Sequence, residues 1–365
     1  MQPLLLLFTN LGVGGVQRKI VDIVNFLASY KPDFPIYILL RNYEDYDLSP
    51  EIKNKNVKII NYQDRIKIRI PFFFPFFEIY QIWRIKPRAI LSFLDFVSVP
   101  AIWAKLLFFW RRTRLVISED HYASKIIPNF KFGHLRNFLV KIFYPFADVI
   151  FTCSQATKDD LIKNYGFLPK KIKIIRNWTT FAERKIEVKE KKYDLIYIGR
   201  LVKVKNISFL IKAFKKIKNL KRDIKLCLIG SGQETENLKR MSRQLGLERH
   251  IDFFKPRHDV ADFLASSRVF VLCSLPRSEG FPVIVLEAMA VGTPVLACDF
   301  AGAREFLRDG QNCYLFRDED EFIKKTLWLL DHPKERETVA DRAYQYVKQY
   351  HSPGNILTYL RELKI

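Results

Sequence analysis

The sequence is 365 residues long, which exceeds one ordinary globular core and fits two domains of about 150 to 180 residues each. A hydrophobic content of 48% excludes a disordered chain. The formal net charge of +22 is unevenly distributed, because residues 51–180 hold 23 Lys and Arg against 9 Asp and Glu and so carry +14. That excess indicates an anionic partner, either a nucleic acid or a lipid surface.

Three features indicate where the chain works. Its five cysteines are scattered, and several lie in apolar strand-like runs, which suggests a reducing compartment. The run at residues 4–8 is short and has no basic residue before it, so it is a first strand and not a signal peptide. The apolar stretch 89–110 is broken by Asp95, Pro100 and Lys105, which favours a strand and a helix over a membrane span. We therefore expect a cytoplasmic protein.

The N-terminal half alternates short apolar strands with helical patterns, which is typical of a parallel α/β sheet. The predicted strands span residues 3–9, 36–40, 57–60, 89–93, 115–118 and 149–153. A loop with Gly14 and Gly15 follows the first strand and leads into a helix at 19–28. Consecutive glycines let the backbone approach a phosphate at a helix N-terminus, although a simple tight turn accounts for them as well. The loop lacks the G-x-G-x-x-G dinucleotide fingerprint.

Charged residues follow the predicted strand 115–118 at its carboxyl end, where ligands of parallel sheets bind. They are Glu119, Asp120 and His121. This segment is a candidate acid–base or acceptor-binding site. A single histidine after a strand is equally compatible with a structural role.

Two stretches, residues 65–88 and 125–145, interleave basic and aromatic side chains. The cationic members we single out are Arg65, Lys67, Arg69, Arg84, Lys86, Arg88, Lys131, Arg136 and Lys141. The aromatic members include Phe72, Phe74, Phe76, Trp83, Phe132, Phe138 and Tyr144. Such a mixture favours an anionic lipid interface, and an ordinary amphipathic helix packed on the core is the alternative.

Polar residues 179–192 show no clear periodicity and are interpreted as an interdomain linker. A second α/β series follows, with predicted strands at 194–198, 225–229, 250–254, 269–273, 294–298 and 313–316. The predicted helices of this half are 207–217, 234–245, 260–266, 283–291, 303–307, 321–330, 335–350 and 355–363.

The most informative stretch, residues 278–294, places Glu279 in a loop and Glu287 on a helix that begins near Pro282. The free backbone N–H groups at the positive end of this helix dipole belong to Gly280, Phe281 and Val283. A carboxylate can hold a ribose diol while a helix N-terminus holds the neighbouring phosphates, so the pattern suits a nucleotide sugar. In the alternative, Glu279 is only a charge favoured near a helix N-terminus and Glu287 is solvated.

Arg200 and Lys205 follow the predicted strand 194–198 and Gly199. Two cations at the mouth of the sheet can hold a diphosphate and offset the charge that develops on it as it leaves. We predict no metal and no cofactor, because the six histidines are dispersed and the Asp-x-Asp patterns at 45–47 and 318–320 look like loops and caps.

Taken together, four segments resemble the retaining GT-B glycosyltransferases of family 4, and their order and spacing match across nearly the whole chain. The segments are Gly-Gly-Val-Gln-Arg at 14–18, Gly-Arg with Lys-Asn at 199–206, Gly-Ser-Gly at 230–232, and the Glu-x7-Glu stretch at 279–295. The Glu-x7-Glu stretch is the specific part. The resemblance implies an α/β fold with two Rossmann-like domains facing a cleft. Residues 1–178 would bind the acceptor, residues 190–334 would bind the nucleotide sugar, and helices in 335–365 would cross back to the first domain.

The resemblance also implies residue roles. Glu279 would contact the donor sugar, Glu287 the ribose, and Arg200 with Lys205 the diphosphate. The donor site would comprise Gly14, Gly15, Gly199, Gly280, Phe281, Pro282, Val283 and Glu287. The family often has a histidine on the acceptor side, and here either Asp120 or His121 fills that place. Lys255 and Pro256 stand where the family usually has a glycine, which leaves the contacts to the nucleotide base open.

We therefore expect a retaining, metal-independent hexosyltransferase that moves a hexose or N-acetylhexosamine from a nucleotide diphosphate sugar, with a UDP-sugar as the preferred donor. The expected acceptor is a polyprenyl-diphosphate-linked glycan, because the charge and the aromatic excess lie in the acceptor domain. Lys131, Arg136 and Lys141 would hold the protein peripherally on the anionic inner membrane face, and no nucleic acid would bind. A nucleotide-sugar epimerase of the same architecture and a nucleic-acid-binding protein are the two alternatives.

Overall fold

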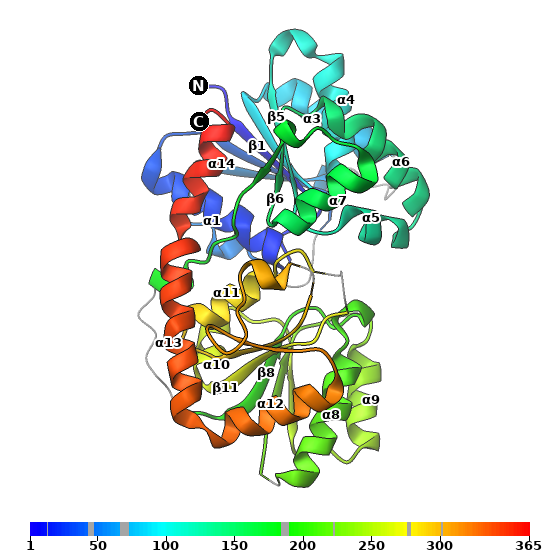
Figure 1. Cartoon of the computed structure of the whole chain (residues 1–365). Coiled ribbons are helices and arrows are strands. Elements are labelled where there is room, and N and C mark those ends of the chain that lie inside the picture. Colours follow the sequence, from blue (N-terminus) through cyan, green and yellow to red (C-terminus); the bar gives the residue numbers. More distant parts are fainter. Residues whose placement is uncertain are drawn as a thin grey trace. The chain divides into compact units, whose positions relative to one another are not determined.

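The structure is a computed structural model that describes residues 1–12, 14–42, 47–65, 73–183, 190–221, 223–275, 279–300 and 302–365. The chain forms two compact units (Figure 1). Unit 1 comprises Met1–Arg176 and Pro353–Ile365, and unit 2 comprises Asn177–Ser352. The predicted residues Lys67, Arg69, Phe72, Asp45 and Ser278, with the linker segment 184–189, lie outside the described residues.

Unit 1 is built on a seven-stranded sheet with the order β3-β2-β1-β4-β5-β6-β7. Its strands are β1 (Leu4–Phe8), β2 (Ile36–Leu40), β3 (Val57–Asn61), β4 (Ala89–Phe93), β5 (Arg114–Glu119), β6 (Val149–Thr152) and β7 (Ile172–Ile174). All neighbouring strands are parallel. Every residue of β1 and β4 is buried, as expected for strands covered by helices on both faces. The strand order reverses between β1 and β4, and ligands of such sheets bind outside the carboxyl ends at this point.

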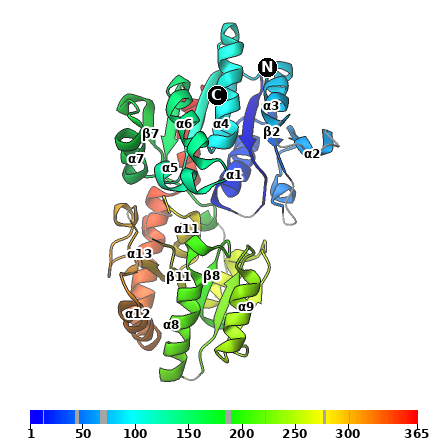
Figure 2. The ribbon, with the colours of Figure 1, turned by 90° about the vertical axis from the view of Figure 1, so that its right-hand side faces the viewer.

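The helices of unit 1 are α1 (Gly15–Tyr30), α2 (Tyr62–Arg65), α3 (Phe74–Ile85), α4 (Asp95–Leu107), α5 (Ala123–Ile126), α6 (Gly133–Phe143), α7 (Gln155–Tyr165) and α14 (Ile356–Glu362). Helix α4 packs against both α3 and α6 (Figure 2). The C-terminal helix α14 returns to unit 1, where the ring of Tyr359 lies 4.6 Å from the ring of Phe151 between centroids. The Tyr359 hydroxyl is also 3.2 Å from the Ser118 hydroxyl at the end of β5.

Unit 2 holds a six-stranded parallel sheet with the order β10-β9-β8-β11-β12-β13. Its strands are β8 (Tyr193–Ile198), β9 (Leu226–Ile229), β10 (Ile251–Phe254), β11 (Ser267–Leu272), β12 (Val295–Cys298) and β13 (Tyr314–Phe316). Its helices are α8 (Ile207–Leu220), α9 (Thr235–Gln244), α10 (Val260–Ala265), α11 (Val283–Ala290), α12 (Glu319–Asp331) and α13 (Pro333–Tyr350). Helix α8 packs against α9 and α12, and α11 packs against α10 and α13, so helices cover both faces of the sheet (Figure 1).

Periodicity explains which helices are amphipathic. In α8 the buried positions Ile207, Leu210, Ile211, Phe214 and Ile217 recur at helical spacing and form one face of the core. In α11 seven of the eight residues are buried, because its sequence is apolar on all sides. A helix of that kind is held by packing from every side and makes a rigid support for a site at its start.

The α/β class with two Rossmann-like units is confirmed, and each of the twelve predicted strands is present. Strand β7 was not predicted, because it has three residues, two of them exposed, and a lysine at its centre. The predicted helix 303–307 is wrong as an α-helix, since this segment forms only the 3₁₀ turn Ala303–Glu305. The predicted segment 335–365 is divided in the structure, with α13 in unit 2 and Pro353–Ile365 in unit 1.

Candidate active site

In unit 2 the motif carboxylate Glu279 and the predicted cation Lys205 form an ion pair between Nζ and Oε1. The Ser274 hydroxyl donates to the same Glu279 oxygen at 2.6 Å. Lys205 ends the 3₁₀ turn Lys203–Lys205 after β8, and Ser274 follows β11, the neighbour of β8 in the sheet. The carboxyl ends of two adjacent strands thus bring together residues that lie 74 positions apart. Glu279 is buried and ion-paired, whereas a charge favoured only by the nearby helix N-terminus would need neither burial nor a partner.

Glu287 lies in α11 and is only 7% exposed. The alternative that this carboxylate is a solvated surface charge is therefore wrong. A buried carboxylate needs hydrogen-bonding or charged partners, and such a group beside an open helix N-terminus suits the diol of a ribose.

The loop before α11 is held by a ring contact and a hydrogen bond, both made by Phe281. The Phe281 ring lies 4.0 Å from the Phe306 ring between centroids, and the Phe281 carbonyl accepts a hydrogen bond from the Asn177 side chain at 2.7 Å. Across the described ranges, the backbone N–H groups of Gly280, Phe281 and Val283 have no acceptor. Three fixed, unsatisfied donors at a helix N-terminus are suited to phosphate or hydroxyl oxygens.

Arg200 is exposed, and its carbonyl accepts a hydrogen bond from the buried Tyr197 hydroxyl at 3.1 Å. Gly199 has a φ of 155°, in a region that favours glycine, and a Cβ there would lie 2.8 Å from the Tyr197 hydroxyl oxygen. A Cβ on Gly230 would lie 1.9 Å from the Gly199 carbonyl oxygen. Close backbone packing between the turns after β8 and β9 therefore accounts for these glycines without a ligand. It also fixes the loop from which the Arg200 side chain extends.

In unit 1, Gly14 precedes α1 and Gly15 is its first residue, so the predicted strand, glycine loop and helix are all present. The Asn10 side chain organises this loop, because its Oδ1 accepts hydrogen bonds from Gly12 N and Gln17 Nε2, each at 3.1 Å. A Cβ on Gly14 would lie 2.4 Å from Gln17 Oε1. The Gln17 side chain therefore lies against Gly14, and a side chain larger than that of glycine would collide with it there.

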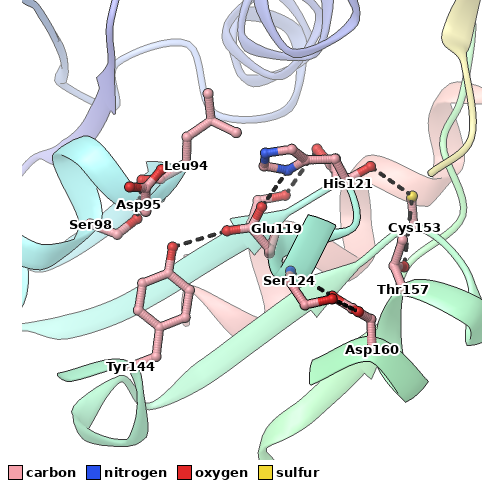
Figure 3. Close-up of polar contacts among 12 residues, drawn as sticks. Leu94, Asp95, Ser98, Glu119, His121, Ser124, Tyr144, Cys153, Thr157 and Asp160 are labelled. Atoms are coloured by element: carbon pink, nitrogen blue, oxygen red, sulfur yellow. Dashed lines mark hydrogen bonds and ion pairs between the residues drawn. The ribbon is translucent and has the colours of Figure 1, made fainter. Parts of the chain in front are cut away.

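His121 belongs to a buried polar chain at the carboxyl end of β5 (Figure 3). Its Nδ1 lies 2.5 Å from Glu119 Oε1, and the Tyr144 hydroxyl donates to Glu119 Oε2 at 3.0 Å. Glu119 and Tyr144 are fully buried, whereas the His121 side chain is 18% exposed. Tyr144 therefore holds Glu119, and Glu119 holds the His121 imidazole through Nδ1. The other ring nitrogen, Nε2, points away from Glu119 (Figure 3).

The charges around His121 favour its protonated form. Burial lowers the pKa of His121, but Glu119, with smaller effects from Asp95 and Asp120, outweighs burial and raises the pKa above the usual 6.5. Burial, and then the Glu119 charge, raise the pKa of Tyr144 well above its usual range, so that hydroxyl stays a donor. The arrangement favours an imidazolium at the edge of the sheet, and its N–H can donate to an anionic or hydroxyl oxygen.

Asp120, the other acceptor-side candidate, has different surroundings. Its Oδ2 lies 2.8 Å from Lys19 Nζ, and the Ser118 hydroxyl donates to the same oxygen at 3.3 Å. Lys19 is only 2% exposed on the inner face of α1. Burial lowers the pKa of Lys19, but the Asp120 carboxylate, with smaller effects from Tyr359 and Cys153, outweighs burial and raises the pKa, so the ammonium group stays protonated. Asp120 therefore ties α1 to the end of β5.

Three residues of the basic aromatic stretches have contacts other than those predicted. Phe74 is completely buried against Phe96, and Tyr144 is completely buried against Glu119, so the prediction that these two rings belong to a lipid interface is wrong. Arg136 donates two hydrogen bonds to Asp95, at 2.6 and 2.7 Å, from a side chain that is 22% exposed. Lys131 and Lys141, in contrast, are exposed. Arg136 thus contributes to the packing of unit 1.

Sequence patterns missed Lys19, Tyr144 and Ser274. Lys19 is the first residue of the predicted helix 19–28, and a lysine at a helix end is normally exposed, so its burial was not expected. Ser274 follows a predicted strand directly, and this position at a strand end was the one signal available for it. Tyr144 was hidden in an aromatic stretch, where nothing local separates a buried ring from an exposed one.

The Asp-x-Asp pattern at 318–320 lies at the start of a helix in the structure. The Asp318 side chain caps α12 by accepting a hydrogen bond from Glu321 N at 2.8 Å. No group of three His, Cys, Asp or Glu side chains that could hold a metal ion occurs within the described ranges. Over the same part of the chain, no helix is long and apolar enough to cross a membrane.

Comparisons with known proteins agree with this geometry. Residues 13–180 match the family model "Glycosyltransferase Family 4", and residues 179–346 match "Glycosyl transferases group 1". A Campylobacter jejuni N-acetylgalactosamine-N,N'-diacetylbacillosaminyl-diphospho-undecaprenol 4-alpha-N-acetylgalactosaminyltransferase is 27% identical over 96% of each chain. A second C. jejuni enzyme, an alpha-1,4-N-acetyl-D-galactosaminyltransferase named for a PP-undecaprenol substrate, is 24% identical over 96% of this chain and 95% of its own.

Among solved structures, Anabaena HepE in complex with UDP and glucose superposes with a TM-score of 0.82 at 20% identity, covering 99% of each chain. Staphylococcus aureus TarM, crystallised as a variant with UDP and other ligands, gives a TM-score of 0.78 at 13% identity over the whole of both chains. At these identities the likeness concerns the fold.

Proposed function

Because the chain belongs to the GT-B glycosyltransferases with a group 1 domain, we propose that it is a retaining enzyme that transfers a hexose or N-acetylhexosamine to a polyprenyl-diphosphate-linked glycan. The observation that carries this proposal is the paired Glu279 and Lys205 at the mouth of the unit 2 sheet. Two relatives matched over nearly their whole length are named for undecaprenol-linked substrates, which supports the acceptor class. A UDP-sugar is the proposed donor, since HepE was crystallised with UDP and with UDP-glucose.

The donor side works through residues already fixed in place. Glu287 holds the ribose, and the N–H groups at the start of α11 hold oxygens of the donor. Lys205 and Arg200 stabilise the negative charge that grows on the departing diphosphate, which is the part of the reaction where preorganised charge lowers the barrier most. Lys205 neutralises Glu279 in this structure, so donor binding places sugar hydroxyls and phosphate oxygens against a site of balanced charge.

On the unit 1 side, His121 supplies a cationic N–H donor to an oxygen of the sugars, and Gly14 with Gly15 presents backbone donors to phosphate. Glu119 acts through His121 by holding its ring and its proton. Tyr144 supports Glu119 in turn, and this buried chain keeps the imidazole in one orientation.

We place the enzyme peripherally on the inner membrane face, because unit 1 exposes an unusual number of large apolar side chains. On α3 they are Phe76 (69%), Tyr80 (51%) and Trp83 (47%), after Phe73 (53%). After α4 they are Phe109 (73%) and Trp110 (61%), and around α6 they are Phe132 (63%), Leu135 (57%) and Phe138 (58%). Helix α4 packs against α3 and α6, the exposed Lys131 has its Nζ 5.4 Å from the Phe132 ring centroid, and Lys141 is exposed on α6. We name the exposed apolar side chains of this set, from Phe73 to Phe138, the aromatic surface.

Calorimetric titration with UDP-, GDP- and ADP-sugars, followed by an assay with a prenyl-diphosphate-linked glycan, tests the proposal. We expect one UDP-sugar to bind and its sugar to appear on the lipid-linked glycan. Epimerised free sugar without transfer to the glycan would favour an epimerase. Tight binding to DNA at moderate salt, with no nucleotide-sugar binding, would favour a nucleic-acid-binding protein.

A further inference from the structure

Unit 1 contains a second charged group at the carboxyl edge of its sheet. Arg41 directly follows β2, and Asp95 with Phe96 opens α4 just after β4. Strands β2 and β4 flank β1, so these residues lie around the point where the strand order reverses. That is the position at which parallel α/β sheets bind ligands.

The Arg41 side chain is held by aromatic rings. Its Cζ atom lies 4.0 Å from the Phe96 ring centroid and 5.7 Å from the Phe74 centroid. The two rings stack with their centroids 5.8 Å apart, and the Arg41 backbone N–H donates to the Thr9 carbonyl at 3.0 Å. A guanidinium that rests on a ring loses less freedom when it binds an anion.

Arg136 approaches the same ring, with its Cζ atom 5.8 Å from the Phe96 centroid. Its two hydrogen bonds to Asp95 engage both oxygens of that carboxylate. Arg41 therefore shares a ring with a second guanidinium, and within the described ranges no carboxylate pairs with it. Burial, and then the positive charge of Arg136, lower the pKa of Arg41. A half-buried cation with unused donors is a costly arrangement that a bound anion would relieve.

We propose that Arg41, held on Phe96 beside Arg136, binds the diphosphate of the lipid-linked acceptor. The planar guanidinium fork matches two phosphate oxygens at once. Arg136 also lies 4.6 Å from the ring of Phe130, which is 45% exposed and adjoins the aromatic surface. The anion site and the apolar surface are thus neighbours, as the diphosphate and the prenyl chain of one acceptor require. The identity of the ligand rests on the proposed function, whereas the anion site rests on the Arg41 contacts.

The test is direct binding of inorganic pyrophosphate and of a short, water-soluble prenyl diphosphate to the full chain. Arg41→Met keeps an unbranched side chain against Phe96 and removes the charge. Arg41→Lys keeps the charge and loses the fork. Lys163→Met removes an exposed charge from α7 of the same unit and is the matched control. Binding of UDP to each variant checks that the chain is folded.

We expect Arg41→Met to weaken binding of both probes about tenfold or more, as for the loss of hydrogen bonds to a charged group. Arg41→Lys should bind with intermediate affinity, and Lys163→Met and the UDP affinities should match the wild type. Equal affinity of Arg41→Met and wild type for both probes would overturn the proposal, as would pyrophosphate binding that a prenyl diphosphate does not displace. A different outcome separates the two proposals: Arg41→Met loses pyrophosphate binding, but the wild type transfers no sugar to a lipid diphosphate. That result would refute the proposed function and would still support the anion site.

Discussion

The two sheets present their charged residues in opposite ways. At the edge of the unit 2 sheet, Glu279, Glu287 and Lys205 belong to one short motif and one loop, and the sequence pattern alone brings them to notice. At the edge of the unit 1 sheet, Asp120 and His121 share one segment, but their supports Lys19 and Tyr144 come from distant segments with no common motif, and only the fold brings them together. The difference indicates that the proposed donor side depends on directly paired charges, and the proposed acceptor side on buried residues that support a few exposed ones.

The largest effect should come from breaking the pair in unit 2. We expect Lys205→Ala to lower kcat by about 10² to 10³, because it removes a preorganised cation from the leaving diphosphate and leaves Glu279 unpaired. Glu279→Gln should also damage activity, and the double variant should lose less than the sum of both, since the partners contact one another. Steady-state kinetics with and without EDTA measures this. EDTA should leave the wild-type rate nearly unchanged, and a rate that needs added metal would contradict the role given to Lys205.

The buried pair in unit 1 should matter for stability. Asp120→Asn leaves the ammonium group of Lys19 buried and unpaired, so we expect the free energy of unfolding to fall by about 3 to 5 kcal/mol. His121→Asn should change stability far less and activity far more. Urea unfolding of both variants, followed by assays on the folded fraction, separates the two candidates. Full stability of Asp120→Asn together with lost activity would make Asp120 the functional residue.

The pKa of His121 sharpens the comparison on the acceptor side. Glu119→Gln removes the charge that raises this pKa, so the NMR titration of His121 should move to lower pH. A histidine whose pKa is raised by folding contributes stability that is fully present below its unfolded value of about 6.5 and is lost as the pH rises through the folded value. The wild type should therefore lose this contribution as the pH rises above 6.5 and through the raised pKa of His121, and Glu119→Gln should not. An unchanged His121 titration in the variant would show that Glu119 does not hold the proton.

The smallest effect per residue concerns the membrane. Each basic side chain near an anionic leaflet contributes on the order of 1 kcal/mol, so Lys131→Glu with Lys141→Glu should weaken sedimentation with anionic vesicles and leave UDP binding intact. Arg136 is left unchanged, because its substitution would also leave the buried Asp95 carboxylate without its ion-pair partner. Trp110→Ala should weaken the part of the binding that persists in high salt. Lys239→Glu on α9 is the control, and wild-type protein that ignores anionic vesicles at low salt would contradict the role of the aromatic surface.

The sequence was sufficient where one pattern determines one element. The strands of both sheets and the start of α11 follow from apolar runs, Gly and Pro, which act locally. It was insufficient where burial is decided by distant segments. Nothing near Tyr144 shows that Glu119 lies 3.0 Å from its hydroxyl, and nothing near Arg136 shows that Asp95 neutralises it. The short edge strand β7 was missed for the same reason, because pairing with β6 and not its own composition makes it a strand.

The measurement that tests the central claim most directly is the structure of the product formed from a UDP-sugar and a prenyl-diphosphate-linked glycan. Proton and carbon NMR of the purified product gives the anomeric configuration of the new bond. We predict that one sugar is added and that it keeps the anomeric configuration of the donor. A product with the inverted configuration would contradict the retaining mechanism, and no lipid-linked product from any donor in the panel would contradict the proposed acceptor.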